Sequence, residues 1–174
     1  LNKVIKNIKM NYGFENRFQN LNSDGYSQIG SQGENISILS RYPGNGTNVT
    51  DYSTFFQSEI NLTEKSKLYS GIRYNINNME FQISDNNIFS LSENNLEMEN
   101  KNFSFSTNLS HYLFENTFIS LSVFSAYRNP NIDDVGKIFS KTGGVVVVPN
   151  TNLRSEKILS TELIFKHSGK ATTF

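Results

Sequence analysis

Cysteine is absent from this 174-residue chain, and histidine occurs only at His111 and His167. Without cysteine, the chain has no disulfide framework, thiolate zinc site, iron–sulfur cluster or cysteine nucleophile. Two histidines are too few for a histidine-based metal site or catalytic triad without further support. No run approaches the roughly 18 apolar residues that a transmembrane helix needs, and the longest comparable stretch is Val145–Val148.

Neither sign of charge dominates, because 16 basic side chains balance 16 acidic ones. Binding to nucleic acid or to anionic lipid as a main activity needs clustered lysine and arginine, so this balance excludes it. Charged residues make up 18% of the chain, and uncharged polar residues are abundant, with 25 Asn and 22 Ser. Aromatic residues reach 13%, and this composition is not that of a disordered chain.

Alternation of apolar and polar residues with a period of two is the main pattern, and it is typical of strands with unlike faces. In one segment, Leu68, Ile72 and Tyr74 share a face that is opposite Lys67 and Arg73. The pattern predicts about six strands: 8–15, 51–62, 67–76, 102–112, 117–127 and 157–166. No segment carries a sustained apolar stripe of helical period, so helices should be scarce.

The connections between these strands alternate in length. Short turns are expected at 63–66 and 113–116, whereas the links 17–50, 77–101 and 128–156 are long. Loops beyond roughly 12–15 residues are uncommon in compact domains and are usually functional. A meander with this alternation places every short turn at one end of the sheet and every long loop at the other.

Transmembrane β-barrels have this asymmetry, and about 9–11 tilted residues per strand cross a bilayer. One face of each expected strand carries residues suited to hydrocarbon, and the other carries residues suited to a wet lumen. A spanning sheet must close, and such barrels have at least about eight strands. We therefore predict an all-β antiparallel meander that is one segment of a larger transmembrane barrel. The alternative is a soluble all-β ligand-binding or adhesion module, whose turn signals would recur every 8–12 residues.

Two neighbouring motifs indicate a family. The run Ser125–Phe139, which reads SAYRNPNIDDVGKIF, resembles the "GFRAPN-DDL" segment of TonB-dependent outer-membrane receptors. The run Val146–Glu156, which reads VVVPNTNLRSE, resembles their "NPNLKPE" signature, and Ser160–Leu163 resembles its "YNYELG" continuation. Arg41–Pro43 and Gly71–Tyr74 are also similar to receptor barrel segments, and the likeness is to the type common in Bacteroidetes-like bacteria. Tyr127, Asn129 and Ser155 depart from the family pattern.

This resemblance implies a 22-stranded barrel in the bacterial outer membrane, filled by a plug domain. Such a receptor imports a scarce nutrient, such as a ferric siderophore, haem, cobalamin or a glycan, with energy from the TonB complex. Residues 1–174 would then be a partial barrel domain, with the plug domain outside this chain. Its partners would be outer-membrane lipid, its own plug domain, the TonB complex and a small nutrient ligand. A passive porin, as a further alternative, would lack the two motifs.

The loop that carries the two motifs, 128–156, can also be interpreted from its residues alone. Pro130 and Pro149 remove ladder donors and end strands. Asn129, Asn131, Asp133 and Asp134 can cap turns through side-chain-to-backbone bonds. The loop either folds for its own stability at the rim or contacts ligand directly.

The candidate site residues fall into two groups. The outer loops supply the ligand-binding candidates, which are Tyr42, Tyr127, Arg128, Asn129 and Asn131. The tyrosines, with Tyr26, have the alternative role of interfacial girdle residues. The lumen- or plug-facing candidates are Gln57, Glu59, Arg73 and Glu162.

Metal, cofactor and catalytic residues are not expected. Both histidines should lie at the periplasmic end, away from an external ligand. The link 77–101 is acidic through Asp85, Glu93, Glu97 and Glu99, but its spacing is not that of a calcium loop, which favours a solvated loop. No catalytic motif occurs, so the chain is not predicted to be an enzyme.

Overall fold

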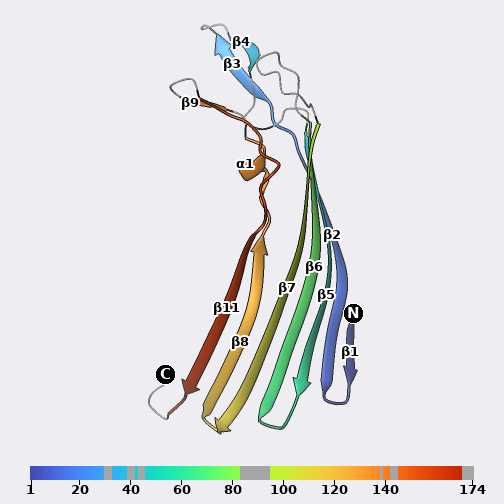
Figure 1. Cartoon of the computed structure of the whole chain (residues 1–174), viewed down its shortest axis with the longest axis vertical. Coiled ribbons are helices and arrows are strands. Elements are labelled where there is room, and N and C mark those ends of the chain that lie inside the picture. Colours follow the sequence, from blue (N-terminus) through green and yellow to red (C-terminus); the bar gives the residue numbers. More distant parts are fainter. Residues whose placement is uncertain are drawn as a thin grey trace.

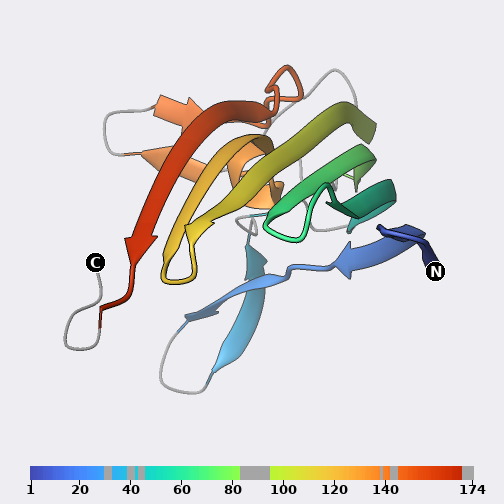
Figure 2. The same cartoon turned by 90° about the horizontal axis from the view of Figure 1, so that it is seen from below.

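A single antiparallel sheet dominates the computed structural model, which describes residues 1–29, 33–38, 42, 46–82, 95–137, 139–141 and 145–169. The sheet has seven strands in the order β1-β2-β5-β6-β7-β8-β11. Their bounds are β1 Asn2–Ile5, β2 Ile8–Leu21, β5 Thr47–Asn61, β6 Ser66–Gln82, β7 Asn95–Phe114, β8 Thr117–Arg128 and β11 Glu156–His167. Figure 1 shows them as one tall wall, and Figure 2 shows that the wall is curved into an arc.

The smaller elements gather at one end of this wall (Figure 1). They are the hairpin of β3 (Gly25–Ile29) and β4 (Glu34–Ile38), the helix α1 (Ile132–Val135), and the hairpin of β9 (Phe139–Lys141) and β10 (Val145–Val147). We call this the loop end. The turns between β1 and β2, β5 and β6, and β7 and β8 lie at the opposite end, the turn end. The predicted meander with alternating loop lengths is confirmed.

Several predicted bounds are wrong. The sheet has seven strands and not the six that were predicted. The missed strand is β1, which is only four residues long and too short to show an alternation. Four strands run further toward the loop end than predicted, since β2 continues to Leu21, β5 begins at Thr47, β6 continues to Gln82 and β7 begins at Asn95. Glu97 and Glu99 are therefore strand residues and not loop residues. Asp85, Glu93, Arg41 and Pro43 lie outside the described residues.

The outer face of the wall, which points away from α1, is an apolar belt built from cross-strand rows. Leu68 pairs with Leu109, Leu109 with Leu121, and Leu121 with Leu163. Two positions further along each strand lies a second row, of smaller residues. A third row, two positions beyond the second, is bulky again and joins Tyr12, Phe56, Ile72 and Phe105.

The side chains of this belt are open to the surroundings. Leu109 is 46% exposed, Leu163 67% and Ile72 50%. No second layer covers this face among the described residues. An exposed apolar face over several strands is what contact with lipid requires.

The inner face, on the side of α1, is polar over the same strands. Its residues alternate with those of the belt and include Asn11, Gln57, Arg73, Ser104 and Ser106. Phe55 is an exception: a Cβ atom on Gly13 would meet its ring at 2.8 Å, so the ring lies against the glycine.

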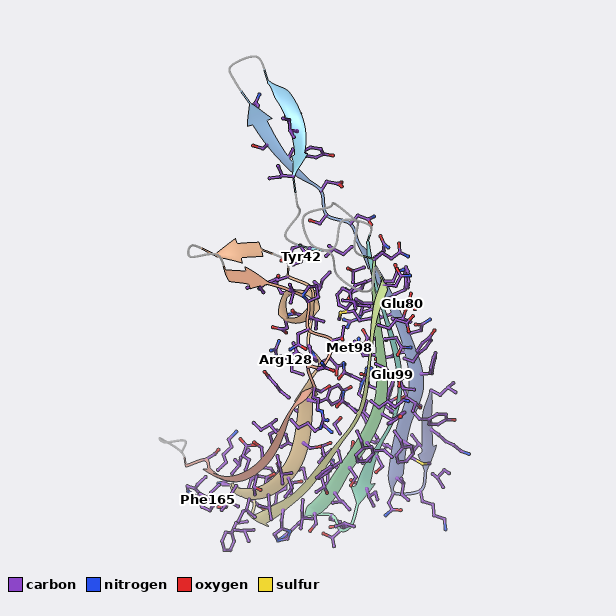
Figure 3. The ribbon with its side chains drawn as sticks, turned by 45° about the horizontal axis from the view of Figure 1, so that its top comes forward. Tyr42, Glu80, Met98, Glu99, Arg128 and Phe165 are labelled. Atoms are coloured by element: carbon purple, nitrogen blue, oxygen red, sulfur yellow. The ribbon has the colours of Figure 1, made fainter. Side chains whose placement is uncertain are left out.

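The two faces exchange character toward the loop end. Beyond Ile76, the outer face of β6 and β7 carries Asn78, Glu80, Glu97 and Glu99. Figure 3 shows Glu80 and Glu99 toward the loop end of the wall and Phe165 near the turn end. The inner face there is apolar, and Met79, Phe81 and Met98 form a small core with Val135 of α1. Apolar residues face inward here because the segment that contains α1 covers them.

Gly136 closes this core, and an added methyl group there should loosen it. A Cβ atom at this position would lie 2.9 Å from Cε1 of Phe81 and 3.2 Å from the carbonyl oxygen of Ile132. Phe81 is 1% exposed and has little room to move. We expect Gly136→Ala to destabilise the docked segment by about 1–3 kcal/mol, seen as faster amide exchange around α1. Asn152→Ala, on an exposed side chain of the same connection, is the control and should change little. Unaltered exchange in the Gly136 variant would contradict the packing argument.

Candidate functional site

A buried polar cluster lies on the inner face below the core, with Asp51 at its centre. The Arg17 guanidinium donates from Nε and Nη2 to Oδ2 of Asp51, at 3.1 and 2.7 Å. Asn77 donates to the other carboxylate oxygen at 3.0 Å, and Asn75 approaches the same oxygen at 3.5 Å. Since Asp51 is 9% exposed, these donors are what allow its charge to be buried.

Two residues of the sequence motifs connect this cluster to β7. Asn129 donates to Oδ1 of Asn75 at 3.0 Å, and Nδ2 of Asn102 donates to Oδ1 of Asn129 at 2.6 Å. Ser155 donates to Oδ1 of Asn129 at 2.7 Å, and its hydroxyl oxygen also lies 3.2 Å from Oδ1 of Asn100. Asn129 and Ser155 are the two ends of the connection that contains α1, which we call the α1 segment (129–155). Both ends are thereby fastened to the inner face of β6 and β7.

Arg128 and Asn131 also hold the α1 segment, through contacts with α1 and with the start of β11. The Arg128 guanidinium donates to both oxygens of Glu156, at 3.0 and 3.2 Å, and to Asp134 at 2.9 Å. Asn131 caps α1 in a capping box with Asp134, as the turn-capping interpretation predicted. Arg128 is the last residue of β8 and Glu156 is the first residue of β11, so this ion pair joins the loop-end termini of the two strands.

The two candidate tyrosines lie in different surroundings. The Tyr42 hydroxyl donates to Asp133, which also lies 3.5 Å from Nζ of Lys137. The 22–46 connection therefore contacts the α1 segment, and Figure 3 shows Tyr42 and Arg128 on that side of the wall. Tyr127 lies deeper, beside Arg73.

Arg73 connects β6 to β2 across the inner face. Its Nη2 donates to Oε2 of Glu15 at 2.6 Å. Glu15, Arg73, Arg17 and Asp51 line one cavity of about 370 Å³ together with Tyr127 and Asn129. A second cavity of about 320 Å³ shares Arg17, Asp51 and Asn129 with the first and extends toward the apolar core. We call the two together the rim cleft.

The remaining inner-face candidates lie nearer the turn end. Glu59 accepts from Lys67 at 3.1 Å and from Lys9 at 3.5 Å. Gln57 accepts from Asn11 at 3.4 Å, and both line a cavity of about 460 Å³ with Glu59. Glu162 lies on the same face at the sheet edge, opposite Ser122. The structure thus places all four of Gln57, Glu59, Arg73 and Glu162 on the inner face, whereas contact with a plug stays a prediction.

Both histidines lie at the turn end, as expected. Nδ1 of His111 is 2.8 Å from the Ser66 hydroxyl, and Nδ1 of His167 is 3.0 Å from the Thr117 hydroxyl. No group of three or more His, Cys, Asp or Glu side chains placed to hold a metal ion occurs in the described ranges. None of the helical residues that the structure describes form a helix long and apolar enough to cross a membrane.

Several residues of the rim cleft were not singled out from the sequence. These are Glu15, Arg17, Asp51, Asn75 and Asn77. Their one sequence signal is the alternation itself, which puts a polar side chain at every second position of 15–17, 51–53 and 73–77. In a chain with 25 Asn, this signal does not separate the cleft from the rest of the inner face.

Comparisons with known proteins agree with this architecture. Residues 4–174 match the family model described as "TonB dependent receptor-like, beta-barrel". Among solved structures, the chain is similar to one titled "Copper transporter OprC", with a TM-score of 0.74 and 13% sequence identity. The match covers 97% of this chain and 27% of that chain, and at this identity it shows the fold alone. No curated protein matches the sequence. The likeness to Bacteroidetes-type receptors stays a prediction.

Proposed function

Because the chain belongs to the family of TonB-dependent receptor β-barrels, we propose that the whole protein takes up a scarce nutrient across the bacterial outer membrane. The family consists of outer-membrane receptors and transporters and not of enzymes. Residues 1–174 contribute a wall segment, and strands from elsewhere in the protein close the barrel, because seven strands leave two unpaired edges. The plug domain also comes from outside this chain, and the TonB complex supplies the energy.

One observation supports this proposal above the others: the same strands are apolar on the outer face and polar on the inner face, with all long connections at one end. Lipid requires the first feature and a wet transport path the second. In this proposal the loop end faces the outside. Arg128, Asn129 and Asn131 shape the entrance, Tyr42 and Tyr127 contact incoming ligand, and Gln57, Glu59, Arg73 and Glu162 face the plug.

Uptake by intact cells tests the proposal. The full-length receptor is produced in its host and in a strain without TonB, and accumulation of ferric siderophores, haemin, cobalamin and oligosaccharides is measured. We expect one ligand class to accumulate only when receptor and TonB are both present. Accumulation that persists without TonB would identify a passive pore. Recovery of the receptor from the soluble fraction would reject the transport assignment.

A further inference from the structure

The backbone ladder between β7 and β8 stops before either strand ends. Its last pair toward the loop end is Ser106 with Phe124, whereas β8 continues to Arg128 and β7 begins at Asn95. The ladder between β8 and β11 runs on to the pair of Arg128 and Glu156. Figure 1 shows that β8 and β11 lean away from β7 toward α1 above this point. Among the described residues, no strand pairing therefore holds the loop end of the β8–β11 pair to the wall.

The part of the chain beyond this point is braced as one body, which we call the lid. Its described residues are 125–137, 139–141 and 145–159. Arg128 forms ion pairs with Glu156 and Asp134, and these join the two strand ends to α1. The amide of Asn150 donates to the carbonyl of Val135 at 2.9 Å, which connects the returning chain to the same helix.

Side chains, and not a ladder, attach the lid to the wall. The Ser125 hydroxyl accepts from the amide of Phe105 at 2.9 Å. Asn102 donates to Oδ1 of Asn129 at 2.6 Å and to the Ser155 hydroxyl at 2.9 Å. Nearer the loop end, α1 packs on the small apolar core of β6 and β7. Such contacts can break and re-form without the unpairing of any strand.

The docked position of the lid leaves buried polar atoms unsatisfied. Oδ1 of Asn77, Nδ2 of Asn100 and Oδ1 of Asn102 are closed off from solvent and have no hydrogen-bond partner among the described residues. Asn100 and Asn102 contact Ser155 of the lid through their other side-chain atoms, and Asn77 pairs with Asn100 across the strands. The cost of such atoms is comparable with the gain from burying an apolar side chain such as that of Val135. Opening the lid hydrates all three atoms, so the docked and open positions are close in free energy.

We propose that the lid is hinged where the β7–β8 ladder ends, between Phe124 and Ser125, and swings off the inner face of β6 and β7. Positions at the ends of paired segments absorb such movements, and here the β8–β11 pairing is kept. Opening lifts Val135 from the apolar core and uncovers the buried asparagines. The lid thereby controls access to the polar inner face at the entrance. This consequence rests on the uptake function proposed above, whereas the movement itself does not.

Labelling of introduced cysteines with N-ethylmaleimide, in the purified full-length receptor in detergent, tests the movement. These 174 residues contain no cysteine, and peptide mass spectrometry measures each introduced one separately. Val135→Cys, at a position that is 1% exposed, reports opening of the lid. Ser120→Cys, at a position that is 4% exposed and paired with both β7 and β11, reports unfolding of the wall. Glu97→Cys, on the exposed outer face, gives the rate without protection.

We expect Val135→Cys to react about 10- to 1,000-fold more slowly than Glu97→Cys, as for an open state populated at about 0.1–10%. Ser120→Cys should react more slowly still, by at least about 100-fold. Equal rates at positions 135 and 120 would overturn the proposal, because the lid would then open only when the wall unfolds. Equal rates at positions 135 and 97 would also overturn it, because the lid would then have no docked position.

Two further measurements test the attachment and the hinge. Added to Val135→Cys, Ser155→Ala should speed labelling about fivefold. Ser122→Ala, which removes a hydroxyl that accepts from Asn108 where the ladder is intact, should not change it. Equal effects of the two serine changes would contradict the attachment.

Amide exchange locates the hinge. The amide of Phe105, which the lid holds through Ser125, should exchange as fast as the lid opens, whereas that of Thr107 within the ladder stays protected. Joint exchange of both amides would overturn the hinge position. Loss of TonB-dependent accumulation in cells is a separate result, which would reject the proposed function and leave the labelling rates as they are.

Discussion

Leu163→Arg should destabilise the folded receptor by about 2–4 kcal/mol, because it places a charge on the lipid-facing side of a membrane-spanning strand. Leu163 lies in the middle of β11, is 67% exposed and pairs with Leu121 in the leucine row of the belt. In lipid, the guanidinium must either enter hydrocarbon or draw water and head groups toward it. Urea unfolding of the full-length receptor in lipid vesicles measures the change.

The neighbouring residue supplies the control. Glu162→Arg introduces the same side chain one position earlier, on the inner face, where the surroundings are wet and polar. We expect a change of less than about 1 kcal/mol for this variant. Equal destabilisation by the two substitutions, or none by Leu163→Arg, would show that the outer face does not contact lipid.

Asp51→Leu should cost about 2–4 kcal/mol, since it removes the acceptor around which the polar cluster is arranged. Arg17 and Asn77 then lose their shared partner, and Asn77, which is 4% exposed, keeps a buried amide with no acceptor. The same unfolding titration gives the free energy. We also expect faster proteolysis of the α1 segment, because Asn129 is fastened to the cluster through Asn75.

Two further variants separate charge from shape in this prediction. Asp51→Asn keeps an acceptor oxygen and should recover part of the lost stability. Glu80→Leu removes a carboxylate from the exposed outer face of β6 and should change the unfolding free energy by no more than about 0.5 kcal/mol. A loss from Glu80→Leu as large as that from Asp51→Leu would point to net charge rather than to the buried contacts.

The strands within the apolar belt could be predicted from sequence because their signal is local. Leu68, Ile72 and Tyr74 all fall on one side of an extended chain whatever their neighbours do. The turns predicted at 63–66 and 113–116 overlap the observed turns at 62–65 and 115–116 for the same reason, since polar residues interrupt two alternating runs.

The strand ends could not be predicted because the alternation changes phase. On β6 the apolar positions are even-numbered up to Ile76 and odd-numbered at Met79 and Phe81. In the local sequence, this change of phase looks like the end of a strand. It reflects the covering of the inner face by α1, whose core residue Val135 lies more than fifty residues further along the chain.

The polar cluster escaped prediction for a similar reason. Asn75, Asn102 and Asn129 are three of 25 asparagines, and only the strand register brings them together. Asn129 and Ser155 lie within the two family motifs but depart from the family pattern, and their contacts with β6 and β7 depend on long-range pairing. The sequence pattern indicates the face of a strand on which a residue lies. It does not indicate which residue of another segment that side chain contacts.

The continuation of β6 from Ile76 to Gln82 sets how far the entrance stands above the bilayer. Six residues at about 3.3 Å each extend the wall by about 20 Å, or about 15 Å in height for a strand tilted by about 40°. The entrance of the barrel therefore stands above the lipid head groups and is not level with them. Under the proposed uptake function, a solute therefore reaches its first contacts with the receptor clear of the membrane surface.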